Sequence, residues 1–369
     1  MTTAAELASY ASSFPSFRNL LINGDMRIAQ RGNSNSVAAS TYAACDRYRF
    51  IITNGGAWDI SQSTDSPDGF GSSYKLECAT AKSSLDSDSR LLIVQSIEGQ
   101  NLQNLKKGTS SAKSLTLSFY VKTSLAGTYQ VNLEDNDNIR IIGNTYTISS
   151  GEVNTWQYKE FTFLGDTTGV LDNDNLDSLA LHFVLVAGSD NSSGSLPTSW
   201  KAKSNADRGA GLTVNLAATV GNTWQITGVQ LEVGTVATPF EHRPYEMELS
   251  LCKRYFQEKI LSSRTIGGSQ SNHIKWRFDF EHVMRSAPDL IVNATYVGSY
   301  APSGNDLTVW GIGASSVALP SLLAISGNKQ SFILYLAVAN SGTGNIYELG
   351  CSDGPTATNP PSVLATAEL

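Results

Sequence analysis

Two clusters of acidic residues are the first features of this chain that could do chemistry. They read Glu-Asp-Asn-Asp at 134–137 and Asp-Asn-Asp-Asn-Leu-Asp at 172–177. A glycosidase needs two carboxylates at a fixed separation, and calcium prefers grouped oxygen ligands. Both clusters lie among turn residues, and the second lacks the glycine and the final glutamate of an EF-hand loop. We therefore expect solvated acidic loops, with a catalytic pair or a calcium loop as the alternatives.

The histidines give no sign of a metal or catalytic site. The four of them, His182, His242, His273 and His282, share no recognisable spacing. His182 lies inside the apolar run at 179–186, where a half-buried histidine with satisfied hydrogen bonds is a more usual state than a ligand. The sequence also contains no HExxH, no GxSxG, no Walker-type loop and no GxGxxG after a strand. It predicts a protein that is not an enzyme and has no cofactor other than the calcium considered below.

Sugar recognition would need an exposed aromatic ring with amides and carboxylates nearby. Among the six tryptophans, Trp156 and Trp224 occupy strand positions typical of a core. Trp200 follows a loop rich in Ser, Gly and Pro, and Trp310 lies next to a glycine-rich turn. Trp200 and Trp310 are therefore the candidate glycan-binding residues, and core packing is the alternative for each.

The cysteines are widely scattered and form neither a CxxC motif nor a Cys/His cluster with zinc spacing. We expect Cys45, Cys78, Cys252 and Cys351 to be buried or half-buried free thiols. This state fits synthesis in a reducing cytoplasm. A bridge between Cys45 and Cys78 is the alternative.

Charge and composition exclude several classes of protein. The net charge of −7 argues against a nucleic-acid binder, which usually presents a basic face. Charged residues make up only 16% of the 369 residues, while Ser, Thr, Asn and Gly are abundant. Such a surface is typical of β-rich proteins, although many buried strands would give the same composition. We expect no secretory signal at the N-terminus, and the longest apolar run, at 332–339, is too short to cross a bilayer.

Short strand-like segments separated by turns fill most of the chain, and a parallel α/β fold is disfavoured because crossover helices are missing. This pattern predicts a mainly β protein with an N-terminal jelly-roll β-sandwich and a smaller C-terminal β-sandwich. We expect a leader or attachment segment at 1–17, the jelly roll at 18–243 and a linking helix at 244–260. A C-terminal β domain with an extended tail would occupy 261–369.

The stretch at 224–257 joins these two domains. It changes from strand-like spacing to helical spacing at Pro244, after which Leu249, Cys252 and Phe256 fall on one stripe. A helix of this length is marginal alone, so its apolar stripe must be buried. The stripe packs either on its own domain or against the same stripe of other copies around a trimer axis. In the second case these three residues form the oligomer interface.

Two ends of the first domain carry motifs that resemble a group of bacteriophage and prophage virion proteins. The opening segment matches at Asn19, Leu20, Asn23, Gly24, Asp25, Gln30, Arg31 and Gly32, followed by Asp46, Arg47 and Tyr48. The closing segment matches at Gln230, Leu231, Glu232, Gly234, Ala237, Thr238, Pro239, Phe240 and Glu241. The match continues at Leu251, Cys252, Arg254, Tyr255, Phe256 and Gln257, and then at Met284, Arg285, Ala287 and Pro288. The resemblance covers the frame at 18–290 without its variable middle.

The resemblance implies a tail-fibre-like or other appended structural protein on the exterior of a phage particle. It further implies a first domain similar to carbohydrate-binding modules, a homotrimer, and attachment to other virion proteins through residues 1–17. The protein would be made in the host cytoplasm and would present glycan- or host-binding surfaces. A head-decorating or head-fibre protein is one alternative. A polysaccharide depolymerase is disfavoured, because the sequence shows no solenoid repeat.

A structural calcium is the remaining expectation. Carbohydrate-binding jelly rolls often hold one with an acidic residue of the last strand, but here Thr227 and Gly228 stand where an acidic pair is common. Asp25 and Glu232 are the candidate metal ligands. The alternative is that Asp25 is a turn residue and Glu232 a solvent-facing strand residue.

Overall fold

The computed structural model describes residues 17–260, 265–270, 273–293, 307–312, 318–327, 331–339, 346–351 and 362–369. It describes side chains at 17–258, 279–290 and 364–369. The chain forms two compact units, Met1–Glu248 with Leu369, and Leu249–Glu368. Apart from Phe17, the expected attachment segment at 1–17 lies outside the described residues.

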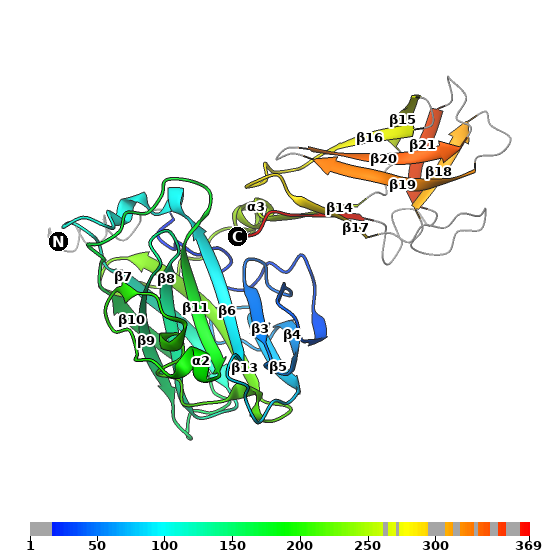
Figure 1. The fold of residues 1–369 in the computed structure, drawn as a ribbon. Coiled ribbons are helices and arrows are strands. Elements are labelled where there is room, and N and C mark those ends of the chain that lie inside the picture. The colour runs from blue at the N-terminus through cyan, green and yellow to red at the C-terminus, as the bar shows by residue number, and fades with distance from the viewer. Residues whose placement is uncertain are drawn as a thin grey trace, which may run out of the picture. The chain divides into compact units, whose positions relative to one another are not determined.

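The first unit contains two antiparallel sheets (Figure 1). The six-stranded first sheet has the order β1-β4-β5-β13-β7-β10. Its strands are β1 (Ser34–Val37), β4 (Ala57–Ser63), β5 (Ser73–Thr80), β7 (Leu115–Thr123), β10 (Gln157–Phe163) and β13 (Thr223–Val233). The seven-stranded second sheet has the order β12-β9-β8-β11-β6-β3-β2. Its strands are β2 (Thr41–Tyr42), β3 (Arg49–Thr53), β6 (Arg90–Glu98), β8 (Gly127–Asp135), β9 (Arg140–Ile148), β11 (Asp177–Ala187) and β12 (Lys201–Ala202).

The core of this unit lies between the two sheets. Every second residue of β7 points inward, and Phe119 of this strand meets Phe183 of β11 with ring centroids 5.1 Å apart. Phe183 in turn contacts Trp224 of β13 at 5.7 Å. Burial of each such side chain contributes about 1.5–3 kcal/mol. Residues between these inward positions face away from the core, so the outer face of each sheet carries its own set of side chains.

Short helices fill the connections. Helix α2 spans Ser189–Ser192, and 3-10 turns span Gly99–Asn101, Gln103–Leu105, Asn205–Asp207 and Leu216–Ala218. No helix among the described residues is long and apolar enough to cross a membrane.

The motif residues at the two ends of the first unit are hydrogen-bonded to one another. Glu241 accepts hydrogen bonds from the main-chain N–H groups of Phe17, Arg18 and Asn19, with N···O distances of 2.8, 3.3 and 2.9 Å. The Asn19 side-chain amide donates a hydrogen bond to the Val229 carbonyl of β13, and its oxygen accepts one from the Leu231 N–H of the same strand. Arg243 donates to the carbonyl oxygens of Asn19 and Leu21. These residues therefore fasten the start of the domain to its last strand.

A second set of hydrogen bonds lies within the opening motif itself. Asp46 accepts a hydrogen bond from the main-chain N–H of Gln30 at 3.0 Å and another from the Gln30 side chain. Gly24 approaches β13 so closely that a Cβ there would lie 2.2 Å from the carbonyl oxygen of Val229. Only glycine fits such a contact. These motif residues build the frame of the domain.

The second unit is also β-rich. A three-stranded sheet has the order β14-β22-β17, and a six-stranded sheet has the order β18-β21-β15-β16-β20-β19. Their strands are β14 (Phe256–Ile260), β15 (Thr265–Gln270), β16 (His273–Asp279), β17 (Asp289–Asn293), β18 (Leu307–Ile312), β19 (Ala318–Gly327), β20 (Ser331–Ala339), β21 (Ile346–Cys351) and β22 (Ser362–Thr366). The predicted fold class, a jelly-roll sandwich followed by a short helix and a smaller β-sandwich, is confirmed.

Two details of the second unit differ from the sequence prediction. Helix α3 spans Tyr245–Lys253, so it ends well before the expected residue 260. Phe256 begins strand β14, which pairs with β22 along its whole length, and this strand pairing replaces the last helical turn. The extended tail expected at the C-terminus ends in β22, the central strand of the three-stranded sheet.

The described cysteines carry free thiols. Cys45, Cys78 and Cys252 are buried and unbridged, as predicted, so the alternative Cys45–Cys78 disulfide is wrong. The side chain of Cys351 lies outside the described residues.

Candidate functional site

A row of aromatic side chains lies on the outer face of the first sheet. We call Tyr158, Tyr120, Phe70, Phe240 and His242 the aromatic row. Successive ring centroids are 5.2 Å apart for Tyr158 and Tyr120, 5.5 Å for Tyr120 and Phe70, and 5.1 Å for Phe70 and Phe240. His242 closes the row, 5.3 Å from Phe70 and 4.9 Å from Phe240. Neighbouring rings are tilted or edge-on to one another, which is the favoured packing for aromatic pairs.

Strand pairing places the two tyrosines. Tyr120 on β7 and Tyr158 on β10 are directly opposite each other in the antiparallel register. Both occupy the alternating positions that face away from the core, where Thr116, Ser118 and Lys122 also lie on β7. Tyr158 is 45% exposed. Its ring therefore offers a face to solvent at one end of the row.

A β-bulge creates the place for Phe70. The pairing of β13 with β7 shifts between Thr227 and Gln230, and Gly228 in the bulge has φ of +63°. A Cβ at Gly228 would lie 2.8 Å from the Phe70 ring. Glycine is required here both by the left-handed backbone and by the ring that packs against it. This packing explains why a glycine stands where the resemblance suggested an acidic residue.

The loop at 64–72, between β4 and β5, carries Phe70. Its turn is closed locally, since the Ser66 hydroxyl donates to the Phe70 carbonyl at 2.6 Å and the Phe70 N–H donates to the Pro67 carbonyl at 3.1 Å. The Asp65 carboxylate accepts hydrogen bonds from Lys122 at 2.7 Å and Trp156 Nε1 at 3.1 Å. Trp156, expected in the core, is thus half-buried on the outer side of the sheet.

Polar groups accompany the rings. Burial raises the pKa of the Tyr158 hydroxyl, with Ser118 and Glu160 as its polar neighbours. On the far side of Tyr120, Lys122 and Asp65 form an ion pair with a 2.7 Å N···O distance. The outer face of the first sheet therefore combines half-exposed aromatic rings with hydroxyl, carboxylate and ammonium groups.

The candidate tryptophans lie elsewhere. The Trp200 ring is half-buried against the core, donates from Nε1 to the Leu164 carbonyl at 2.7 Å and lies 5.2 Å from the Lys107 ammonium. This matches the core-packing alternative. Trp310 lies on β18, and its side chain is outside the described residues. The aromatic row was not predicted from the sequence, although Tyr120 and Tyr158 occupy outward positions in alternating strands.

The two candidate calcium ligands have other partners. Asp25 is buried next to Arg27, with a 3.0 Å N···O distance, and burial raises the pKa of its carboxyl. Glu232 is also buried, not solvent-facing, and accepts hydrogen bonds from the Thr238 N–H at 2.8 Å and hydroxyl at 2.7 Å. Among the described residues, no group of three or more His, Cys, Asp and Glu side chains could hold a metal ion. The geometry gives the calcium expectation no support.

The first acidic cluster is not the solvated loop that its sequence suggested. Glu134 is buried and bonded bidentately by Arg208, at 2.8 and 3.2 Å, with Lys203 at 3.2 Å. Burial alone would raise the pKa of Glu134, but the nearby charges of His182, Arg208 and Lys203 lower it to about 2. Asp135 is fully buried and paired with Lys107. Glu134 and Asp135 are the last two residues of strand β8. Because both carboxylates are held in ion pairs, we interpret them as structural residues.

His182 belongs to the same cluster. It is buried on β11, and its Nδ1 lies 3.5 Å from Glu134 Oε1. Burial lowers the pKa of the His182 imidazole, and the nearby Glu134 carboxylate acts in the opposite direction. The second acidic cluster is more open, with Asp172 exposed and Asp174 and Asp177 half-buried.

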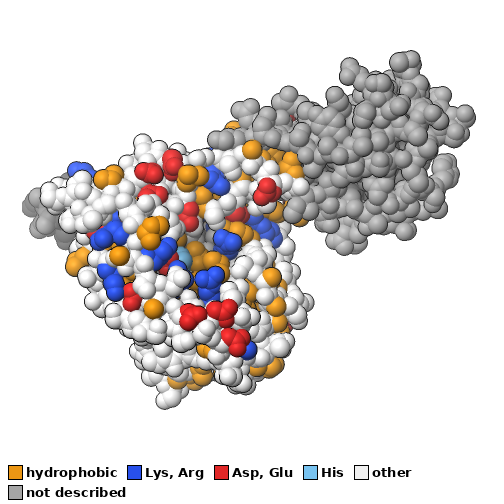
Figure 2. Space-filling model, in the orientation of Figure 1, with side chains coloured by type: hydrophobic (Ala, Val, Ile, Leu, Met, Phe, Trp, Pro, Cys, Tyr) orange, Lys and Arg blue, Asp and Glu red, His pale blue; other side chains and the backbone are white. Residues whose placement is uncertain are grey.

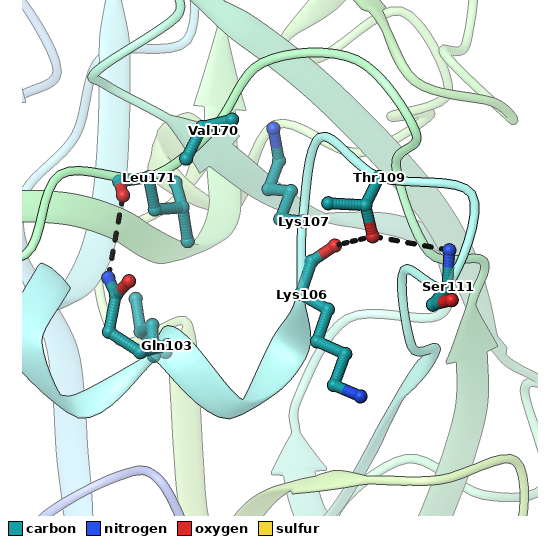
Figure 3. A pocket seen from close by; sticks show the side chains of 8 residues that line it. Gln103, Lys106, Lys107, Thr109, Ser111, Val170 and Leu171 are labelled. Carbon is teal, nitrogen blue, oxygen red and sulfur yellow. Dashed lines mark hydrogen bonds between the residues drawn. The ribbon is translucent and has the colours of Figure 1, made fainter.

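A cavity of about 300 Å³ opens beside the 3-10 turn at Gln103–Leu105 (Figure 3). Its side chains include Gln103 and Lys107, whose polar groups bond the protein itself. Gln103 Nε2 donates to carbonyls that include Gly99 and Leu171, at 3.0 and 3.4 Å. The Lys107 ammonium donates to Asp135 and to the Thr168 and Gly169 carbonyls. These contacts occupy the polar groups of Gln103 and Lys107, while Lys106, Thr109 and Ser111 also line the cavity.

Figure 2 shows one face of the first unit with lysines and arginines interspersed among acidic, apolar and uncharged side chains. No field of one sign covers this view. The distribution agrees with the low net charge and differs from the basic face of a nucleic-acid binder.

Comparisons with known proteins give only distant similarity. No family model matches the chain, and no curated protein sequence matches it. A solved structure of the enzymatically active domain of tailspike protein 4 from bacteriophage CBA120 is 12% identical over 58% of this chain and 21% of that chain, with a TM-score of 0.30. A family 11 carbohydrate-binding module from Clostridium thermocellum, in complex with a mixed-linked tetrasaccharide, is 12% identical over 58% of this chain and 100% of that chain, with a TM-score of 0.27. A xylan-binding domain from Paenibacillus barcinonensis is 10% identical over 57% of this chain and 100% of that chain, also at 0.27. Similarity at this level carries no conclusion about function.

Proposed function

We propose that the protein is a non-enzymatic, trimeric subunit of a phage appendage whose first unit binds glycans through the aromatic row. The observation that carries the proposal is the line of half-exposed rings on the outer face of the first sheet. Aromatic faces bind the apolar faces of sugar rings, while nearby polar groups fix the orientation of hydroxyls. The row supplies both, since hydroxyl and carboxylate groups border its rings.

The ion pairs of Glu134 and Asp135 disfavour these two residues as the acid of a glycosidase. A glycosidase requires one carboxylic acid that stays protonated, which means a raised pKa. Glu134 has the opposite property, because neighbouring cations lower its pKa to about 2. The Asp135 carboxylate is held in an ion pair with the Lys107 ammonium. Neither residue is suited to act as a general acid.

The particle role rests on the motif resemblance and on what its residues do. The motif side chains of Asn19, Asp46 and Glu241 all bond main-chain groups that close the domain. A frame that fastens the chain at its entry and exit suits a rigid module placed between an attachment segment and a second unit. We propose a location on the exterior of the virion, with attachment through the N-terminal segment.

Binding of the purified protein to host surface polysaccharide tests the proposal. We expect the wild-type protein to be retained on immobilised polysaccharide, and we expect Tyr158→Ala and Phe70→Ala to weaken retention by about tenfold each. Tyr245→Ala is a matched control, since Tyr245 is 50% exposed on α3 and lies outside the row. Full retention of both row variants, or no retention of the wild type, contradicts glycan binding by the row. Release of new reducing ends contradicts the non-enzymatic assignment.

A further inference from the structure

We propose that Asp65 is the positioning residue that holds Phe70 in the aromatic row, so that the loop at 64–72 is a closable flap whose closed state depends on this one carboxylate. The inference rests on the proposed function, because it assigns the residue that completes the glycan-binding surface. The rings of the aromatic row are held in two different ways. Tyr120 and Tyr158 are fixed by strands, whereas Phe70 is carried by a loop.

The loop is joined to the first sheet mainly through Asp65. One carboxylate oxygen accepts from Lys122 on β7 at 2.7 Å and from Gln225 on β13 at 3.3 Å. The other accepts from Trp156, next to β10, at 3.1 Å. A single side chain thus accepts hydrogen bonds from two neighbouring strands, β7 and β13, and from the residue that precedes a third, β10. The Asp65 carbonyl accepts a further bond from the Ser73 hydroxyl at 2.6 Å.

The remainder of the loop bonds to itself. The bonds among Ser66, Pro67 and Phe70 lie inside the turn, so they hold its shape without holding it to the sheet. Phe70 reaches the sheet only by packing, over Gly228 and against Tyr120. If the Asp65 contacts are lost, the turn can move as a body and take the ring with it.

An ionised carboxylate is needed for this role. The donors are an ammonium, an indole N–H and an amide N–H, and all of them require acceptor oxygens. Asparagine would replace one acceptor by a donor and would remove the charge that strengthens the Lys122 bond. That bond holds the pKa of Asp65 below its ordinary value, so the carboxylate stays ionised over the neutral range. Lys122 is the charged group that contacts the Asp65 carboxylate, and Asp68 lies in the loop itself.

Three substitutions in the full chain separate positioning from simple stability. We expect Asp65→Ala and Asp65→Asn to weaken polysaccharide binding by about fivefold to tenfold, while the melting temperature stays within a few degrees. Asp65→Glu keeps the charge and should recover part of the affinity. Asp68→Asn is the matched control, because Asp68 is an exposed carboxylate three positions along the same loop.

Hydrogen exchange supplies a readout that needs no glycan. We expect the amide of Phe70 to exchange at least about tenfold faster in Asp65→Ala than in the wild type or in Asp68→Asn, because a turn that leaves the sheet exposes its internal bond to Pro67 to water, where the bond opens more often. Unchanged exchange and unchanged affinity in Asp65→Ala would overturn the inference. If exchange accelerates but the wild type binds no polysaccharide, Asp65 does hold the loop to the sheet and the proposed glycan-binding function is wrong. If exchange accelerates and binding is unaffected, Asp65 holds the loop but does not position a binding residue.

Discussion

At the scale of single residues, Gly228 decides whether the aromatic row can form. Its φ of +63° and the 2.8 Å approach of the Phe70 ring to a Cβ at this position are two separate reasons for glycine. We expect Gly228→Ala to lower the free energy of unfolding by about 2–4 kcal/mol, from backbone strain and from the displaced ring. Urea unfolding measures the loss, and polysaccharide affinity should fall with it.

Gly221→Ala separates the two contributions. Gly221 has φ of +85°, but nothing lies within 4 Å of a Cβ built there. We expect this control to lose only the cost of backbone strain, about 1 kcal/mol, and to keep its affinity. Equal losses in the two variants would show that Phe70 does not depend on Gly228.

Glu134 makes stability depend on pH. Its pKa is lowered from 4.5 to about 2 in the folded chain, so its contribution is fully present above pH 4.5 and is lost as pH falls towards 2. The lost stability amounts to at most about 3 kcal/mol. We expect the free energy of unfolding to fall from about pH 4.5 down to about pH 2, measured by urea titration at each pH.

Glu134→Gln should remove this dependence. The variant leaves Arg208 without its anionic partner, so we expect it to be less stable than the wild type at pH 7 and to lose less on acidification. Glu160→Gln, at an exposed carboxylate of β10, is the control that should follow the wild-type curve. A Glu134→Gln variant with the full wild-type pH dependence would show that another group is responsible.

At the scale of elements, the alternation of apolar and polar residues predicted the positions of the strands well. It did not predict which side chains from distant parts of the chain contact them. Strand β7 was readable because apolar and polar residues alternate along Leu115–Thr123. The prediction for the cluster at 134–137 was wrong because acidic residues beside a turn are usually exposed to solvent. The cations that pair with the buried Glu134 carboxylate belong to residues about seventy positions later in the chain. Local sequence cannot show such distant partners.

Helix α3 shows the same limit. The spacing of Leu249, Cys252 and Phe256 fits a helix, but the helix ends at Lys253 and Phe256 joins a strand paired with β22. That partner lies more than a hundred residues away, so helical periodicity was the stronger local signal. The site was partly hidden for the same reason, because Phe70 and Phe240 meet only in the folded domain.

At the scale of the whole molecule, the two units are joined through α3, and the helix is where the proposed trimer can be tested. Cys252 and Phe256 are buried within a single chain, so they are not available to form a contact between copies. Leu249 remains the candidate interface residue, since it is only half-buried. A trimer seam would cover its exposed surface.

This difference in burial separates assembly from folding. We expect Leu249→Asp to convert a trimer into folded monomers, because a carboxylate in a seam loses its hydration. Cys252→Asp should instead unfold the second unit, since it places a charge in the interior of one chain. Light scattering gives the mass of each species and circular dichroism reports its fold. A Leu249→Asp protein that keeps the mass of three chains would exclude Leu249 from the interface, and a monomeric wild type would exclude the trimer itself.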